Sequence, residues 1–222
     1  IGDAVGKHDS ALMVSLATVL TRQQRYDEAE EVYRAIVALQ PSVAEWHYAL
    51  AGFLASRGRL EEAKASLDEV LRHDPNRVDA CLRLGIVLEN LDDFAGAISA
   101  LERGLQIDPR DVNLRAELAW ILATGPDDAI RNGPRALELA RGAVADSSAQ
   151  SLKAREALAA ALAETGDFSN AAATVRNLLD DPSAQVSEDV RRRWTNELDR
   201  YLQHHPWTDT RHAPGDVLDG SL

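Results

Sequence analysis

The stretch at residues 78–109, VDACLRLGIVLENLDDFAGAISALERGLQIDP, is one copy of a pattern that recurs with a period of about 34 residues. Leucine, small residues and proline mark the repeat at fixed positions. These markers are Leu16, Leu50 and Leu84; Ala17, Ala51 and Gly85; Leu20, Leu54 and Leu88; Ala29, Ala63 and Ala97; and Pro41, Pro75 and Pro109. Each copy contains two apolar stripes at helical spacing and no alternating strand pattern, which is typical of a helix-turn-helix solenoid. The sequence therefore predicts an all-α repeat protein.

The spacing within this stretch resembles that of the tetratricopeptide repeat (TPR) family. The matching residues are Cys81-x2-Leu84-Gly85-x2-Leu88, then Ala97-x3-Leu101, then Pro109, with Cys81 where a tryptophan is usual. The resemblance implies a right-handed superhelical solenoid, here of about five helix pairs and a C-terminal capping helix. It also implies a concave face, lined by the first helix of each repeat, that holds a peptide or a helix of a partner protein.

The repeat markers predict the domain organisation. We expect an N-terminal lead-in, a solenoid, a capping helix and a flexible tail, at residues 1–9, 10–184, 185–205 and 206–222. The solenoid divides into repeats of about 10–43, 44–77, 78–111, 112–150 and 151–184. In the fourth repeat Ala136 follows Ala97 at a wider interval than Ala97 follows Ala63, which places a five-residue insertion between Thr124 and Pro134. That segment resembles a long-loop repeat variant found near the C-terminus of many bacterial TPR proteins.

Charge and composition exclude several classes of function. A formal net charge of -12 argues against nucleic acid and anionic membranes, which require a basic surface, and favours a partner segment that is apolar or basic. No apolar run approaches the roughly 18 residues needed to span a bilayer, so we expect no direct membrane insertion. Cys81 is the one cysteine, which excludes an intrachain disulfide and a multi-cysteine zinc site. The compartment stays open between bacterial cytoplasm and periplasm.

Candidate chemical groups are few. His8, His47 and His73 belong to separate places in the repeat, while His204, His205 and His212 cluster beside the predicted tail, where a flexible segment would supply poor metal geometry. Carboxylates fall at helix starts, turns and exposed faces, and no phosphate-binding glycine motif or hydrolase elbow occurs. We therefore predict no metal site, no cofactor and no catalytic residues.

The remaining candidate is the concave face. First-helix positions predicted to line it and to bind a partner are Val14, Thr18, Tyr48, Gly52, Leu82, Ile86, Glu89, Asn90 and Trp120. Tyr48 and Trp120 are the expected anchors, because large amphipathic rings bury much area at low entropic cost. The alternative for Trp120 is that it packs under the inserted loop. Some TPR proteins grip a C-terminal carboxylate with Lys, Asn and Arg, and those places here hold Val14, Thr18 and Tyr48. The residues of that clamp are therefore absent, and we do not expect an adaptor for chaperone tails of that kind.

Three functions follow from these features. The first is a non-catalytic interaction scaffold that binds a partner peptide or helix in the concave groove. The second is the C-terminal regulatory or substrate-docking module of a larger bacterial enzyme, a glycosyltransferase or a kinase, whose catalytic region would precede Ile1. The third is self-association through the N-terminal end, where the first repeat lacks an evident cap and leaves apolar surface open.

Overall fold

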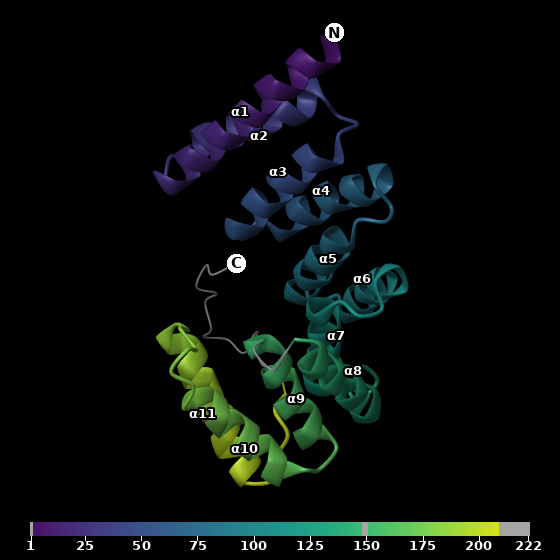
Figure 1. Ribbon diagram of the computed structural model, residues 1–222, viewed down its shortest axis with the longest axis vertical. Coiled ribbons are helices and arrows are strands. Elements are labelled where there is room, and N and C mark those ends of the chain that lie inside the picture. The colour runs from purple at the N-terminus through teal and green to yellow at the C-terminus, as the bar shows by residue number, and fades with distance from the viewer. Residues whose placement is uncertain (1, 148–150, 209–222) are drawn as a thin grey trace. The chain divides into compact units, whose positions relative to one another are not determined.

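The computed structural model describes residues 2–147 and 151–208, and within those ranges the fold is entirely helical (Figure 1). Eleven helices occur there and no strand, which confirms the predicted all-α class. In the part of the chain that is described, none of these helices combines the length and the apolar character that a membrane crossing requires.

The chain divides into two compact units, one ending at Leu91 and the next beginning at Asp92. In the first unit each helix packs against the next one along the chain, as expected of a solenoid. Its helices are α1 (Gly2–Arg22), α2 (Tyr26–Leu39), α3 (Ala44–Ser56), α4 (Leu60–His73) and α5 (Val78–Asn90). The predicted lead-in of residues 1–9 is thus helical from Gly2 and continuous with α1.

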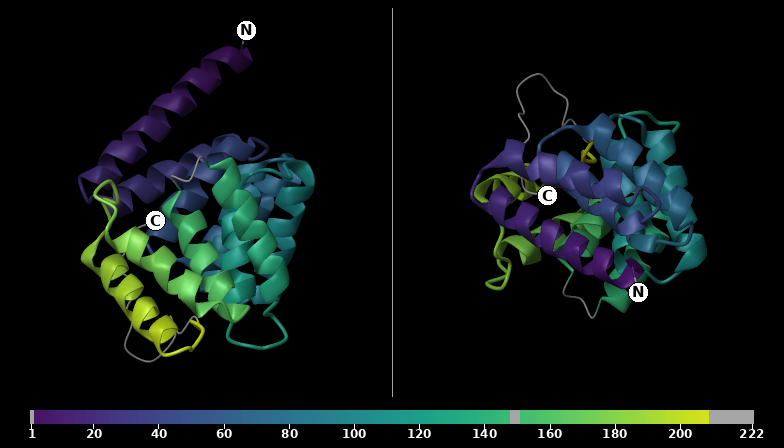
Figure 2. Two further views of the ribbon diagram at one scale, coloured as in Figure 1. Left: turned by 60° about the horizontal axis from the view of Figure 1, so that its bottom comes forward. Right: turned by 90° about the horizontal axis from the view of Figure 1, so that it is seen from above.

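The second unit repeats this plan with one additional contact, between α7 and α9. Its helices are α6 (Phe94–Ile107), α7 (Val112–Thr124), α8 (Gly133–Asp146), α9 (Leu152–Glu164), α10 (Phe168–Leu179) and α11 (Glu188–Leu202). The left view of Figure 2 shows α10 and α11 side by side, in agreement with their packing. The predicted tail begins at residue 206, and its residues 209–222 lie outside the described part of the chain.

Small residues lie where neighbouring helices meet. Ala17, Ala51, Ala29, Ala63 and Ala97 are all fully buried, as their recurrence in the sequence predicts, because a larger side chain would force the paired helices apart.

The burial of the leucines that mark the repeat depends on where the repeat lies along the solenoid. Leu50 and Leu84 are buried, whereas Leu16 at the same repeat position is 51% exposed, together with Leu12 and Val19. The difference arises because α1 is the first helix of its unit and packs against α2 on one side only. The apolar surface predicted at the N-terminal end is therefore present, while self-association through it stays a prediction.

The turns between the paired helices repeat a left-handed backbone conformation. Gln24, Gly58 and Asp92 occupy the same position in successive repeats and have φ values of 61°, 71° and 61°. Gly58 suits this region because it has no Cβ, whereas Gln24 and Asp92 adopt it at a steric cost. The sequence marks only the glycine.

The inserted segment forms a closed loop at residues 125–132, between α7 and α8. Arg131 donates to the carbonyl of Gly125 at 2.7 Å and to Glu164 of α9 at 3.2 Å. Asn132 caps α8 by accepting from the backbone N–H of Arg135 at 3.2 Å, and Pro134 occupies the first turn, where a missing backbone donor is harmless.

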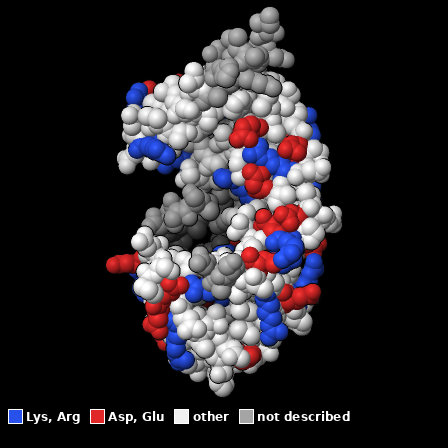
Figure 3. Space-filling model, viewed as in Figure 1, with Lys and Arg blue, Asp and Glu red and all other residues white. Residues whose placement is uncertain are grey.

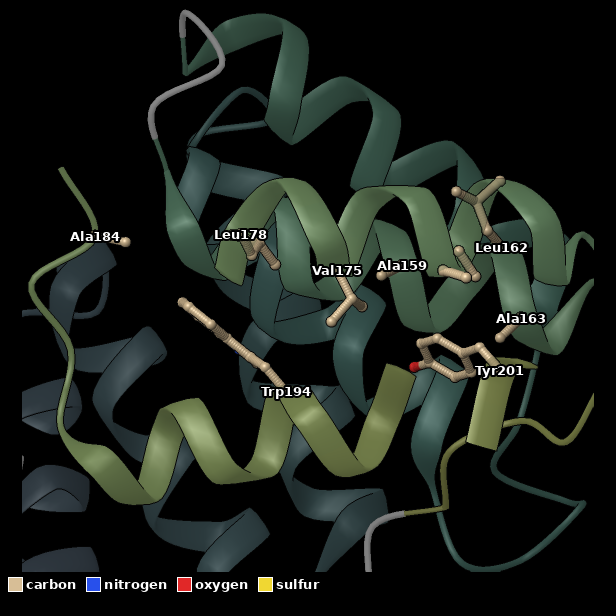
Figure 4. Close-up of a cluster of buried hydrophobic side chains, with 10 residues drawn as sticks. Ala159, Leu162, Ala163, Val175, Leu178, Ala184, Trp194 and Tyr201 are labelled. Atoms are coloured by element: carbon tan, nitrogen blue, oxygen red, sulfur yellow. The ribbon is translucent and has the colours of Figure 1, made fainter. Parts of the chain in front are cut away.

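The capping helix α11 closes the second unit. Trp194 and Tyr201 point from α11 into a cluster with Val175 and Leu178 of α10 (Figure 4). The helical spacing of Val190, Trp194, Leu198 and Leu202 in the sequence predicts a buried apolar stripe on this helix. Leu202 is instead exposed, and Tyr201 takes its place. The step from Trp194 to Tyr201 nearly completes two helical turns, which brings Tyr201 to the same face and rotates Leu202 away.

Charges of both signs lie intermixed on the face shown in Figure 3. In the first unit, Arg59 pairs with Glu30 at 2.5 Å and Arg34 pairs with Glu62 at 2.7 Å, so α2 and the start of α4 exchange ion pairs across their exposed faces. Such exposed pairs contribute little stability individually, and here they balance local charge.

Candidate partner-binding pocket

A pocket of about 450 Å³ opens between α1, α3 and α5 of the first unit. These are the first helices of the predicted repeats, which the family resemblance assigned to partner binding. The residues that line the pocket are Val14, Thr18, Thr21, Arg22, Tyr33, Tyr48, Ala49, Gly52, Phe53, Ser56 and Arg83.

The floor of the pocket is apolar and aromatic. The rings of Tyr33 and Phe53 lie with their centroids 5.2 Å apart, and both residues are buried. Gly52 makes room for Arg83, because a Cβ built at that position would lie 2.9 Å from Nη1 of Arg83. The absence of a side chain at Gly52 thus lets Arg83 reach over the floor.

Two arginines lie against the ring of Tyr48, which lines the pocket. The guanidinium carbons of Arg77 and Arg83 lie 4.0 and 4.6 Å from its ring centroid, a cation–π arrangement. Arg77 is itself fixed by Glu45 at 2.8 Å and by Asp79 at 2.9 Å. Tyr48 is therefore a positioned, half-buried ring rather than a freely rotating one.

Asp79 shows the electrostatic balance around Tyr48. Burial raises the pKa of its carboxyl, but the hydrogen bond and charge of Arg77, with a hydrogen bond from Tyr48, outweigh burial and hold the pKa below its usual value. Asp79 thus stays ionised and holds Arg77 in place. Arg83, and not Arg77, lines the pocket.

The hydrogen-bonding groups that line the pocket are mainly acceptors, apart from the arginines. The hydroxyls of Thr18, Thr21 and Ser56 donate to carbonyls of their own helices at 2.8, 2.8 and 2.7 Å, so their protons are already used. Arg22 and Arg83 supply the charged donors, and neither forms an ion pair among the described residues. No aspartate or glutamate lines the pocket within the described part of the chain. This combination favours a ligand with an apolar group and a carboxylate.

Comparison with known proteins identifies the family. Two family models described as tetratricopeptide repeat match residues 14–63 and 54–121. The chain is a tetratricopeptide repeat protein. Every residue that lines the pocket, from Val14 to Arg83, falls within the matched ranges.

Relatives and a solved structure agree with this family. The TPR chain is 27% identical over 111 residues to Protein O-mannosyl-transferase TMTC1 of Homo sapiens, covering 50% of this chain and 13% of that protein. It is 32% identical over 95 residues to the Hsp70-Hsp90 organizing protein of Triticum aestivum, covering 43% of this chain and 16% of that protein. The chain thus spans only a small part of the relatives it matches.

The solved structure of YrrB, described as a TPR protein with an unusual peptide-binding site, superposes with a TM-score of 0.60 at 19% identity. The superposition covers 84% of this chain and 93% of that chain. At this identity the likeness shows the fold alone.

The structure brings together only part of the predicted partner-binding set. Val14, Thr18 and Tyr48, with Gly52, line the one pocket described above. On α5, Leu82 and Ile86 are half-buried and do not line it. These residues remain candidates for an extension of the binding surface along α5.

Two other predicted residues on α5 offer less to a partner. The side-chain amide of Asn90 donates to the carbonyl of Ile86 at 2.7 Å, so one of its donors is used within the helix. Glu89 is only 3% exposed, so its carboxylate cannot edge a binding strip as predicted. The helical period turns Glu89 with Cys81 and Gly85 into the protein, away from the half-buried face.

Trp120 does not present an anchor surface in the TPR structure. It is 3% exposed, with Nζ of Lys153 (α9) 4.9 Å and the guanidinium carbon of Arg193 (α11) 5.9 Å from its ring centroid. The prediction of an exposed anchor is wrong here because α9 packs closely against α7. These two cations from α9 and α11 lie against the buried ring.

The sequence argument missed Arg22 and Arg83, and the repeat could have located both. Arg22 and Ser56 occupy the same repeat position as Asn90, which was included. Arg83 occupies the position of Ala49, directly after Tyr48 in the preceding repeat. Applying the Asn90 position to every repeat would have included Arg22, and extending the predicted face by one position after Leu82 would have included Arg83.

Proposed function

We propose that this TPR protein is a non-catalytic interaction scaffold, and that the pocket between α1, α3 and α5 receives an anchor side chain from a peptide or helix of a partner protein. The observation that supports this most is an open pocket of about 450 Å³ with an aromatic floor and two arginines free of ion pairs among the described residues. A pocket of this size lies at the lower end of the range for ligand sites and suits one or two side chains.

The lining refines the chemistry of the proposed partner. An apolar anchor would contact Val14, Tyr33 and Phe53, and a neighbouring carboxylate would pair with Arg22 or Arg83. The sequence favoured an apolar or basic segment because the whole chain has a net charge of -12. At this pocket both charged side chains, Arg22 and Arg83, are cationic. We therefore propose a partner segment that is apolar and acidic, in place of one that is apolar or basic.

A peptide-display selection tests this function. Random peptides selected on the purified chain are expected to be enriched in an aromatic or aliphatic residue close to Asp, Glu or a C-terminal carboxylate. Selection on the Arg83→Glu variant, which reverses one charge of the lining, should lose the acidic preference and retain the apolar one. Enrichment of lysine-rich and arginine-rich peptides by the wild type, or of no motif, would contradict the proposal.

The likeness to a glycosyltransferase favours a second candidate. Because half of this chain resembles a segment of Protein O-mannosyl-transferase TMTC1, the same pocket could serve as the substrate-docking or regulatory module of a larger enzyme. Coding sequence on either side of this chain distinguishes the two: a catalytic domain in the same reading frame supports the docking module, and its absence supports the free-standing scaffold.

A further inference from the structure

His47, Glu69 and His73 form a compact cluster in the first unit, and none of the three lines the pocket. One ligand atom from each side chain lies within 4.8 Å of the other two. Glu69 and His73 are one turn apart and share a face of α4, while His47 comes from α3. The two imidazole rings stack with centroids 6.0 Å apart. The sequence argument that His47 and His73 belong to separate places is therefore wrong, because α4 folds back on α3 and brings them together.

The surroundings of His47 favour a metal ligand. His47 is 7% exposed, and its Nε2 lies 2.8 Å from the carbonyl of Pro41. A carbonyl can only accept, so this bond places the ring proton on Nε2 and leaves the lone pair on Nδ1. Metal-binding histidines commonly donate their second ring nitrogen to a carbonyl in this way, which fixes both tautomer and orientation.

Arg72 occupies the cluster as a cation. Its Nη2 contacts the Glu69 carboxylate and lies 2.7 Å from Nε2 of His73. Because a guanidinium is always protonated and can only donate, Nε2 of His73 must be an acceptor with an available lone pair. A positive group thus already lies against two of the three ligand atoms. The Arg72 side chain is 61% exposed, so it can move into solvent when another cation replaces it.

We propose that His47, Glu69 and His73 bind one divalent transition-metal ion of the zinc class, which displaces Arg72. Two imidazoles and one carboxylate suit Zn²⁺ better than Mg²⁺ or Ca²⁺, which prefer oxygen ligands. At metal–ligand distances of about 2.0–2.2 Å, ligand atoms in a tetrahedral site lie roughly 3.5 Å apart. Small side-chain rotations would close the present cluster to that spacing. The ion would join α3 to α4 and leave its fourth position for water or for a donor from a partner.

The test uses the full chain without a polyhistidine tag, with His204, His205 and His212 replaced by glutamine to remove the second histidine cluster. Titration calorimetry with zinc chloride is expected to show one ion per chain. The melting temperature should rise with zinc, because the ion binds only the folded arrangement, and should not rise with magnesium at the same concentration.

Three variants in this background locate the ion. His73→Gln and Glu69→Gln each remove a ligand and should weaken zinc binding at least about tenfold, the lower bound for losing a supporting group at a metal site. Arg72→Gln removes the competing cation and should strengthen zinc binding, which a merely structural role of Arg72 would not produce. Circular dichroism confirms that each variant folds. The proposal is overturned by absence of zinc binding in the background chain, by unchanged affinity in the folded His73→Gln variant, or by weaker binding in Arg72→Gln.

Discussion

The indole Nε1 of Trp194 donates to Oε1 of Glu156 at 2.8 Å and joins the capping helix α11 to α9. Both residues are buried, and Arg193 donates to the same oxygen at 2.7 Å, so the charge of Glu156 is compensated. Removing the Trp194 donor would leave the buried Glu156 carboxylate with one hydrogen bond fewer, which lowers the stability of the folded state. This contact explains how a helix with an otherwise charged sequence holds the end of the second unit.

Trp194→Ala should therefore lower the free energy of unfolding by about 3–5 kcal/mol, the usual cost of removing a buried aromatic side chain. Trp194→Phe, which keeps much of the packing and loses only the donor, should cost about 1–2 kcal/mol. Urea denaturation followed by circular dichroism measures both. Arg192→Ala is the control, because Arg192 lies on the exposed side of α11. Equal stability of Trp194→Ala and wild type would show that α11 does not stabilise the second unit.

Gln24→Gly should stabilise the protein. Gln24 adopts φ 61°, a left-handed conformation that costs a residue with a Cβ roughly 1 kcal/mol. Glycine removes that cost but adds entropy to the unfolded chain, so we expect a net gain of about 0.5 kcal/mol. Gly58→Ala is the matched reverse change at the same repeat position and should destabilise by a similar or larger amount. Thermal melts that rank the two variants in the opposite order would refute the turn assignment.

Asp181 should make stability depend on acid pH. Hydrogen bonds from the Ser183 hydroxyl, from Arg155 and from the Ser183 backbone lower the pKa of its carboxyl from 3.8 to about 2. Because the folded state favours the ionised form, this stabilisation is complete above the unfolded pKa near 4 and disappears as the pH falls toward 2. Asp181→Asn should therefore be less stable than wild type at pH 6, and the difference should shrink at pH 2.5. A difference that is the same at both pH values would contradict this assignment.

The two predicted aromatic anchors should behave differently. Tyr48→Ala should weaken the binding of a selected peptide by about 2 kcal/mol, since it removes the ring on which Arg83 is stacked. Trp120→Ala should mainly lower stability, because the ring is buried beneath Lys153 and Arg193. Calorimetry with the selected peptide and a thermal melt separate the two effects. Loss of affinity in Trp120→Ala with an unchanged melt would restore Trp120 as a contact residue.

Much of the fold could be predicted from the sequence, because a constant repeat period fixes which residues share a face. Ala17, Ala51 and Ala63 are buried as expected for this reason. The repeat position of Leu16 alone predicts burial, whereas the lack of an evident N-terminal cap predicted the open apolar surface to which Leu16 belongs. The repeat period predicts which positions are equivalent, but it does not predict which of them are exposed at the ends of the solenoid.

The site was less predictable, because it depends on contacts between helices. The repeat placed Val14 and Tyr48 on one face, but only the packing of α5 shows that Arg83 reaches over Gly52. In the same way, no spacing rule places His47 beside His73, which lie on different helices, until α4 returns along α3. The charged side chains of the pocket and of the histidine cluster do not recur with the repeat period, so the period could not locate them.

The most direct test of the pocket is to fill it without disturbing the core. Gly52→Leu places a side chain where the end of Arg83 now lies, so Arg83 must move away from the floor, and it replaces a helix-interior glycine with a strong helix former. Gly142→Leu is the matched control, because Gly142 also lies within a helix and faces an arginine, Arg115, in the second unit. Calorimetry with the peptide selected on wild type measures the affinity of both variants. We predict that Gly52→Leu keeps a wild-type melt and binds at least about tenfold more weakly, a loss of about 1.4 kcal/mol, while Gly142→Leu binds as wild type does. Equal affinity of wild type and a folded Gly52→Leu variant would show that the partner binds elsewhere on the chain.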